Sequence, residues 1–83
     1  MKYTVIWERS AEHDLTEIWL HSRLKHAINQ AVAKIDDDLK AKPQECGESR
    51  ERGRRAHFAW PLGVAYLIEE DDRQVRVLSV WHT

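Results

Sequence analysis

The sequence is poor in the features that cross-link, anchor or export a chain. It has one cysteine, Cys46, in 83 residues, so no disulfide can form within it, which is typical of a reducing compartment. The first ten residues lack the apolar core and cleavage site of a signal peptide, and no segment approaches the ~20 apolar residues that span a bilayer. We therefore expect a cytoplasmic protein that does not bind membranes.

An excess of charge of one sign is also lacking. The 13 Lys and Arg residues nearly balance the 14 Asp and Glu residues, for a formal net charge of -1. Domains whose whole surface binds nucleic acid usually carry a strongly basic balance. The distribution is uneven, however, because the stretch "RERGRR" at 50–55 places four arginines within six positions. Any anion site must therefore be local.

Length and composition predict a single domain over residues 1–83. A second domain would leave neither half enough chain to bury a core. Hydrophobic residues make up 42% of the chain and charged residues 33%, as in ordinary soluble globular proteins.

The hydrophobic pattern changes its period twice along the chain. Residues 3–7 alternate as in a strand with one buried face, and residues 10–22 and 24–39 carry apolar side chains at helical spacing. A loop at 44–53 precedes three strand-like runs joined by tight turns, which should pair antiparallel. The pattern predicts an α+β fold of order β-α-α-β-β-β, with two N-terminal helices packed on a mostly antiparallel sheet of about four strands.

The same pattern predicts a helix cap and a core. Ser10 is expected to cap the first helix by accepting a bond from an amide of its first turn. The expected core, one apolar face of each element, comprises Val5, Leu15, Ile18, Ile28, Val32, Ile35, Phe58, Tyr66 and Val77.

Three stretches, in order and at compatible spacing, resemble the RelE/ParE toxin superfamily, which includes plasmid stabilisation proteins. "SAEHDLTEIW" at 10–19 is similar to the family's Ala-x-x-Asp-Leu-x-x-Ile helix start, and "LKAKPQECG" at 39–47 is similar to its Leu-x-x-x-Pro-x-x-x-Gly helix exit. Residues 54–82, from "RRAHF" to "VWH", are similar to its three closing strands with a terminal histidine. The resemblance covers nearly the whole chain.

The resemblance implies a toxin of a type II toxin–antitoxin system, inhibited by a cognate antitoxin protein. Members of the superfamily either cleave messenger RNA on the ribosome or poison DNA gyrase, so the implied targets are the ribosome with its message, or gyrase. No cofactor is expected. The histidines at 13, 21 and 26 do not share the i, i+4 spacing of a metal-binding helix, so no metal site is expected either.

Ribosome-dependent cleavage needs a proton acceptor, a proton donor and cations beside one phosphate. His82 is the leading acid–base candidate, because several ribonuclease members carry a late histidine and imidazole titrates near neutrality. Glu48 is similar in placement to a loop glutamate that some members use as a base, and Arg55 is the candidate phosphate ligand. Strand alternation places Arg55 and His57 on one face. The candidate residues for binding nucleic acid or antitoxin are Arg50, Arg52, Arg54, Arg55, His57 and Trp81.

Two departures from the family pattern favour a different mechanism. Gly63 stands where ribonuclease members typically place an arginine, and the chain ends "WHT" where many members continue with paired arginines. The candidate catalytic set is therefore incomplete for an endoribonuclease. The alternative is a protein that only binds: a gyrase-directed inhibitor, or a decayed toxin with no nuclease activity that still binds its partner.

Overall fold

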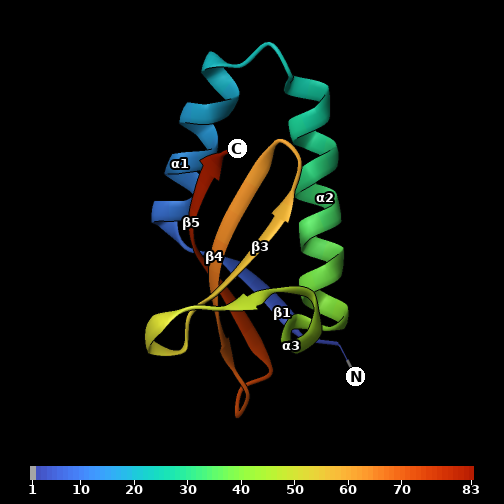
Figure 1. Cartoon of the computed structure of the whole chain (residues 1–83), viewed down its shortest axis with the longest axis vertical. Helices are drawn as coiled ribbons and strands as arrows, with labels where there is room; N and C mark the ends of the chain where they lie inside the picture. Colours follow the sequence, from blue (N-terminus) through green and yellow to red (C-terminus); the bar gives the residue numbers. More distant parts are fainter. Residues whose placement is uncertain (1) are drawn as a thin grey trace.

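The computed structural model describes residues 2–83, and its elements follow the predicted order with two additions (Figure 1). Strand β1 is followed by two long helices, a short helix and four further strands. The bounds are β1 Thr4–Trp7, α1 Arg9–His21, α2 Lys25–Ala41, α3 Pro43–Cys46, β2 Glu48–Ser49, a 3-10 turn Glu51–Gly53, β3 Arg55–Ala59, β4 Leu62–Glu69 and β5 Gln74–His82.

The strands form one mixed sheet in the order β1-β5-β4-β3-β2. β1 pairs with β5 in parallel, and the other neighbours pair antiparallel. The α+β prediction is confirmed, but the sheet has five strands where about four were expected. The additional strand, β2, has only two residues and falls in the stretch predicted as a loop, because a strand that short has no readable period.

The helices cover one face of the sheet, and the core lies between them and the strands (Figure 1). Four predicted core residues, Ile28, Ile35, Tyr66 and Val77, are fully buried. Four more, Val5, Leu15, Ile18 and Val32, are partly buried and pack against this cluster. We call the other side of the sheet the open face.

Phe58 was wrongly predicted to lie in the core. Its side chain is 46% exposed. The alternation along β3 is predicted correctly, but the two faces are exchanged. His57 points toward α2, where its ring bonds Asp38, so Phe58 lies on the open face. A phenylalanine is more often buried than a histidine, and here the hydrogen bond of His57 reverses that preference.

Helix α1 begins differently from the prediction. Glu8 is the N-cap residue and makes no side-chain capping bond, so Ser10 is not the cap. Its hydroxyl instead donates to the Leu78 carbonyl oxygen at 2.7 Å, and Asp14 Oδ2 accepts from the Val80 amide at 3.1 Å. The side chains of α1 thus bind β5 at an irregularity in its pairing with β4, where the register shifts between Ala65 and Tyr66.

This irregularity orients the end of β5. Tyr66 pairs with Val77 while Ala65 pairs with Ser79, so Leu78 is an extra residue in β5. The insertion reverses the alternation: Val77 and Val80 are both buried against the helices, and Trp81 is placed on the open face.

Candidate functional site

The arginine-rich stretch forms an exposed turn at the edge of the sheet. Arg52 and Gly53 have φ angles of 61° and 75°, a left-handed pair that reverses the chain tightly enough for the Arg50 amide to donate to the Arg54 carbonyl oxygen at 2.6 Å. The side chains of Arg50, Arg52 and Arg54 are exposed, and Figure 1 shows the turn (yellow) projecting beside the sheet. We call these three residues the arginine loop.

Glu48 lies at the base of this loop and not beside a histidine. Its carboxylate pairs with Arg50 at 3.0 Å, and both side chains are largely exposed. An exposed pair of this kind contributes little to stability and leaves the loop cationic overall.

Arg55 points away from the loop and binds the protein itself. Its guanidinium donates to Tyr66 Oη at 3.3 Å, Ser49 Oγ at 3.0 Å, and the carbonyl oxygens of Gln44 and Gly47 at 2.8 and 2.6 Å. These bonds join α3 and β2 to the centre of the sheet. Arg55 therefore uses its donors to hold the loop in place, and few remain for a phosphate.

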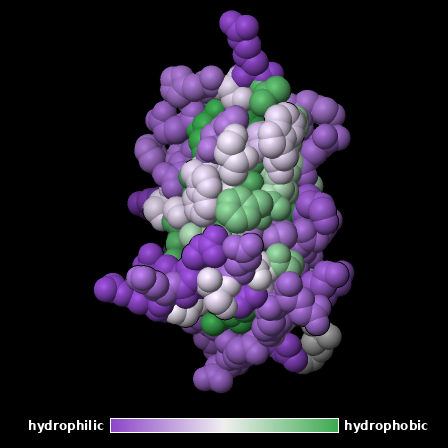
Figure 2. Space-filling model, in the orientation of Figure 1, coloured by the Kyte–Doolittle hydropathy of each residue, from purple (hydrophilic) through white to green (hydrophobic). Residues whose placement is uncertain are grey.

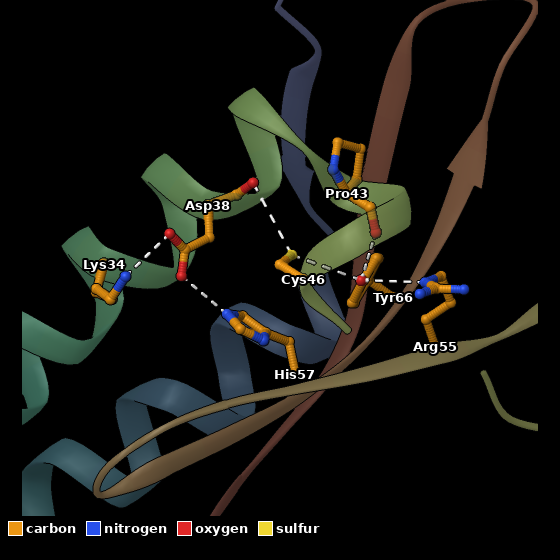
Figure 3. Close-up of polar contacts among 7 residues, drawn as sticks. All are labelled: Lys34, Asp38, Pro43, Cys46, Arg55, His57 and Tyr66. Atoms are coloured by element: carbon orange, nitrogen blue, oxygen red, sulfur yellow. Dashed lines mark hydrogen bonds and ion pairs between the residues drawn. The ribbon is translucent and has the colours of Figure 1, made fainter. Parts of the chain in front are cut away.

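His57 shares the helix-facing side of β3 with Arg55, as the alternation predicted, and joins β3 to α2 (Figure 3). Its Nε2 lies 2.9 Å from Asp38 Oδ2, and Lys34 Nζ lies 3.1 Å from Asp38 Oδ1. Burial by itself would raise the pKa of Asp38, but the hydrogen bonds from His57 and Lys34 outweigh it and lower that pKa. The imidazole is thus engaged by a carboxylate inside the structure.

Tyr66 and Cys46 complete this polar cluster (Figure 3). The Tyr66 hydroxyl donates to the Pro43 carbonyl oxygen at 2.7 Å and lies 3.8 Å from Cys46 Sγ. Burial raises the pKa of Cys46, and it raises the pKa of Tyr66 to about 12 against the opposing effect of the Arg55 bond. Neither group supplies a base or nucleophile near neutrality.

His82 lies at the other end of the sheet. It pairs with Leu62 on β4, whereas Arg55 pairs with Tyr66, four positions along the same strand. At ~3.3 Å per residue this offsets them by ~13 Å along the strands, and β4 also lies between them. The His82 side chain is exposed and lines a shallow depression of about 430 Å³ with Ile18, His21, Ser22, Arg23 and Leu24.

The structure therefore divides the predicted site residues into two groups. Glu48, Arg55 and the arginine loop lie together around β2, and His82 lies near the end of α1 with Arg23 and His21, which the sequence analysis did not single out as its neighbours. No sequence signal joined Arg23 to His82, since they lie 59 positions apart in the chain.

Gly63 has a structural role that its position in the family pattern did not reveal. It pairs with both Phe58 and Trp81, and a Cβ atom at this position would lie 2.6 Å from two atoms of the Trp81 ring. The absence of a side chain lets the indole lie directly against the backbone of β4. A glycine inside a strand is the signal of such a close approach.

Residues 2–83 contain neither a metal-binding cluster nor a membrane-spanning helix. Within that range no three His, Cys, Asp or Glu side chains are grouped so that they could hold a metal ion. None of the helices described there has the length and apolar character needed to cross a membrane.

Comparison with known proteins identifies the family. The model of the ParE toxin of type II toxin–antitoxin systems (parDE) matches residues 5–83. No curated protein sequence matches the chain. Among solved structures, the fold is similar to a chain of the toxin–antitoxin complex RelBE2 from Mycobacterium tuberculosis, with a TM-score of 0.84 and 22% identity over 100% of this chain and 93% of that one.

Two further structures share the fold. A chain of the chromosomal ParDE system of Pseudomonas aeruginosa gives a TM-score of 0.77 at 19% identity, covering 98% of this chain and 96% of that one. The conserved hypothetical protein HP0894 from Helicobacter pylori gives a TM-score of 0.66 at 14% identity, covering 96% of this chain and 93% of that one. The resemblance read from the sequence is thus confirmed, and the chain belongs to the ParE toxin family of type II toxin–antitoxin systems.

Proposed function

We propose that this chain is a toxin neutralised by a cognate antitoxin protein, and that it acts by binding DNA gyrase and not by cutting RNA. Its family supports the first part, and two of the structures that share its fold belong to toxin–antitoxin pairs. The second part rests on the geometry of the candidate site. Gyrase and ribosomes are both cytoplasmic, so the proposal requires the chain to act there.

The observation that carries the proposal is the separation of His82 from Arg55. Cleavage beside a ribose 2'-hydroxyl needs an acid, a base and a cation, each within about 3 Å of the reacting atoms of one phosphate. His82 and Arg55 are ~13 Å apart along the sheet. Arg55 is also committed to four protein acceptors, and Glu48 is paired with Arg50. This arrangement supports binding over catalysis.

One observation favours the second candidate, a ribosome-dependent endoribonuclease. His82 is exposed beside Arg23 and His21 in the depression at the end of α1. An imidazole and a guanidinium that line one depression could act together, the imidazole transferring a proton while the cation holds a phosphate. In that mechanism Arg23, and not Arg55, would be the phosphate ligand.

The experiment that separates the two is expression in a bacterial host without antitoxin, using the wild-type chain and His82→Ala. Primer extension on a translated message reports RNA cleavage, and detergent-trapped DNA breaks report gyrase poisoning. We expect growth arrest with intact messages and gyrase-dependent breaks, equally for both chains.

Three other results would contradict the proposal. Messages cut in the ribosomal A site by the wild type but not by His82→Ala would establish the nuclease. Arrest with neither cut messages nor DNA breaks would exclude both targets. A chain that folds but causes no arrest would be a decayed toxin.

A further inference from the structure

Strand β1 forms one edge of the sheet and leaves that edge open. Its single neighbour in the sheet is β5. The amides of Thr4 and Glu8 donate to carbonyl oxygens in and just before β5, at 2.9 and 3.0 Å. Because the backbone groups of alternate residues in a strand point to the same side, Ile6 faces β5 as well, and Val5 and Trp7 turn their N–H and C=O groups outward.

The outward groups of Val5 and Trp7 have no hydrogen-bond partner among residues 2–83. Each residue contributes one donor and one acceptor, and both residues are only half-buried. The edge is closed one step earlier in the chain, where the Tyr3 amide donates to the Lys40 carbonyl oxygen at 2.9 Å. Four backbone groups are therefore open to another strand.

The composition of β1 does not protect this edge. Edge strands of natural proteins are commonly blocked by a charged side chain, a proline or a bulge. Residues 3–7 read "YTVIW" and contain no charge and no proline, and β1 pairs with β5 in a regular register. The opposite edge is protected, because β2 has only two residues and the arginine loop projects beside it, where Figure 2 shows a mostly hydrophilic surface.

We propose that β1 pairs with β1 of a second copy of this chain, antiparallel, about a two-fold axis that passes by Ile6. In this register Val5 lies opposite Trp7 of the second copy, and the two residues exchange two hydrogen bonds. The symmetric pair does the same, so all four open groups of each copy are bonded. An axis at Val5 would instead place Trp7 opposite Tyr3, whose amide is already bonded to α2.

The apolar side chains of β1 fit this register. Val5 and Trp7 pack against the core, so Ile6 between them lies on the open face and is half-buried. In the proposed pair Ile6 lies opposite Ile6 of the second copy, in a non-hydrogen-bonded position where the Cβ atoms are about 4.5–5.5 Å apart. Each isoleucine therefore covers the other.

Opposite charges flank this contact. Thr4 lies opposite Glu8 of the second copy, so the exposed Lys2 is the diagonal neighbour of that carboxylate, within reach of a long side chain. Glu8 accepts from Arg76 through Oε1 at 2.9 Å, which leaves Oε2 for the ammonium group. The two-fold axis repeats the pair, and this complementary charge favours a second copy over an unrelated strand.

The dimer leaves the arginine loop of each copy uncovered. Its continuous sheet has ten strands, two copies of five, with β2 at both outer edges. Nine strand spacings of ~4.8 Å put the two loops ~43 Å apart along a flat sheet. One particle then presents two identical surfaces, and a partner with two matching sites binds it with increased avidity. The inference goes beyond the proposed function and does not depend on the target.

The test is sedimentation velocity of the purified chain from about 10 µM to about 1 mM. A contact this small is weak, so we expect a Kd on the order of 100 µM and a mass that rises toward that of two chains. Ile6→Lys places two like charges opposite each other and should raise the Kd about 10-fold or more. Leu20→Lys is the matched control, since Leu20 is 58% exposed on α1, and its Kd should change less than ~3-fold.

The flanking charges are tested by salt. Lys2→Glu should dimerise more weakly than wild type at about 50 mM salt, and the difference should nearly vanish at about 500 mM, where exposed charges are screened. Circular dichroism of each variant, compared with wild type, shows whether the fold is retained.

Hydrogen exchange of the wild type locates the contact without any substitution, so it decides the matter even where Ile6→Lys does not fold. The amides of Val5 and Trp7 should exchange about 3-fold or more slowly at about 1 mM than at about 10 µM, because the dimer bonds them. The Ile6 amide faces β5 in both states and should exchange alike at the two concentrations.

Several outcomes would overturn the inference. These are the mass of a single chain at the highest concentration, equal dimerisation by folded Ile6→Lys and Leu20→Lys, or a dimer in which the Val5 and Trp7 amides exchange as fast as in the single chain. Protection of these two amides by the protein encoded in the adjacent reading frame, with a single-chain mass in its absence, would assign the edge to a strand of that protein instead.

Discussion

Replacing Arg55 by alanine should destabilise the protein before it affects any target. Three of the four acceptors of its guanidinium, the Gln44 and Gly47 carbonyl oxygens and Ser49 Oγ, lie in the α3–β2 segment, and the fourth is the hydroxyl of Tyr66. That segment spans few residues, of which Pro43 is buried and Cys46 packs against the core. Arg55 is therefore one of the main connections between it and the sheet, beside the pairing of β2 with β3 and the bond from the Tyr66 hydroxyl to the Pro43 carbonyl oxygen.

The magnitude follows from these contacts. A hydrogen bond to a charged group contributes about 1.5–3 kcal/mol, but the carbonyl oxygens freed by the substitution can bond water, and bonds in one network are not additive. We expect a loss of about 2–3 kcal/mol, against a total stability of about 4–12 kcal/mol for a domain of this length. At about 4–8 °C per kcal/mol, Tm should fall by about 8–24 °C. Arg55→Lys should recover little of this, because an ammonium cannot reach four dispersed acceptors.

The assay is urea denaturation followed by circular dichroism, with Arg54→Ala as the control. Arg54 precedes Arg55 directly but is exposed in the arginine loop, so its removal should change the free energy of unfolding by less than about 0.5 kcal/mol. If Arg55→Ala were as stable as Arg54→Ala and lost only activity, Arg55 would be a ligand for the target and the structural role argued here would be refuted.

Three further predictions concern the cluster around Tyr66. Because the pKa of Asp38 is lowered, its carboxylate stabilises the fold above pH ~4, and this contribution is lost as the pH falls through that pKa. In Asp38→Asn the free energy of unfolding should therefore fall less than in wild type between about pH 5 and 2. Urea denaturation measures this, and parallel pH dependences for the two proteins would contradict it. Gly47→Ala would place Cβ 2.2 Å from Tyr66 Oη and should lower the free energy of unfolding by about 2–3 kcal/mol. Gly53 has a φ of +75° and open space around it, so Gly53→Ala should lower it by about 1 kcal/mol. Equal midpoints of the two variants in urea denaturation would refute the clash at Gly47. Tyr66→Phe should remove a phenolate absorbance step near pH 12, and loss of a step near pH ~10 instead would show that burial does not shift this hydroxyl.

Periodicity was sufficient to predict most of the fold. The change from a period of two to 3.6 and back predicted the order of β1, α1, α2 and the last three strands, because each of these elements buries one long face. The short elements α3 and β2 could not be predicted, since their placement depends on the side chain of Arg55, which follows them in the chain. Local pattern does not encode such a contact.

The candidate site was predictable only in part. The sequence located the exposed cationic loop correctly, because four arginines near two glycines have few ways to be buried. It did not show that Arg55 turns inward or that His82 is offset from it by ~13 Å along the strands, since both follow from strand register and from the extra residue Leu78 in β5. In the family pattern Gly63 stands for a missing arginine, and only the pairing of three strands shows that it accommodates Trp81.

The proposed function is poisoning of DNA gyrase without RNA cleavage. Its most direct test is a reaction of purified chain, purified gyrase and supercoiled plasmid DNA, in which detergent traps cleaved complexes. The proposed function predicts gyrase-dependent double-strand breaks that rise with the concentration of the chain and are the same for His82→Ala. Intact plasmid at saturating chain, together with cleavage of a ribosome-bound message that His82→Ala abolishes, would contradict it.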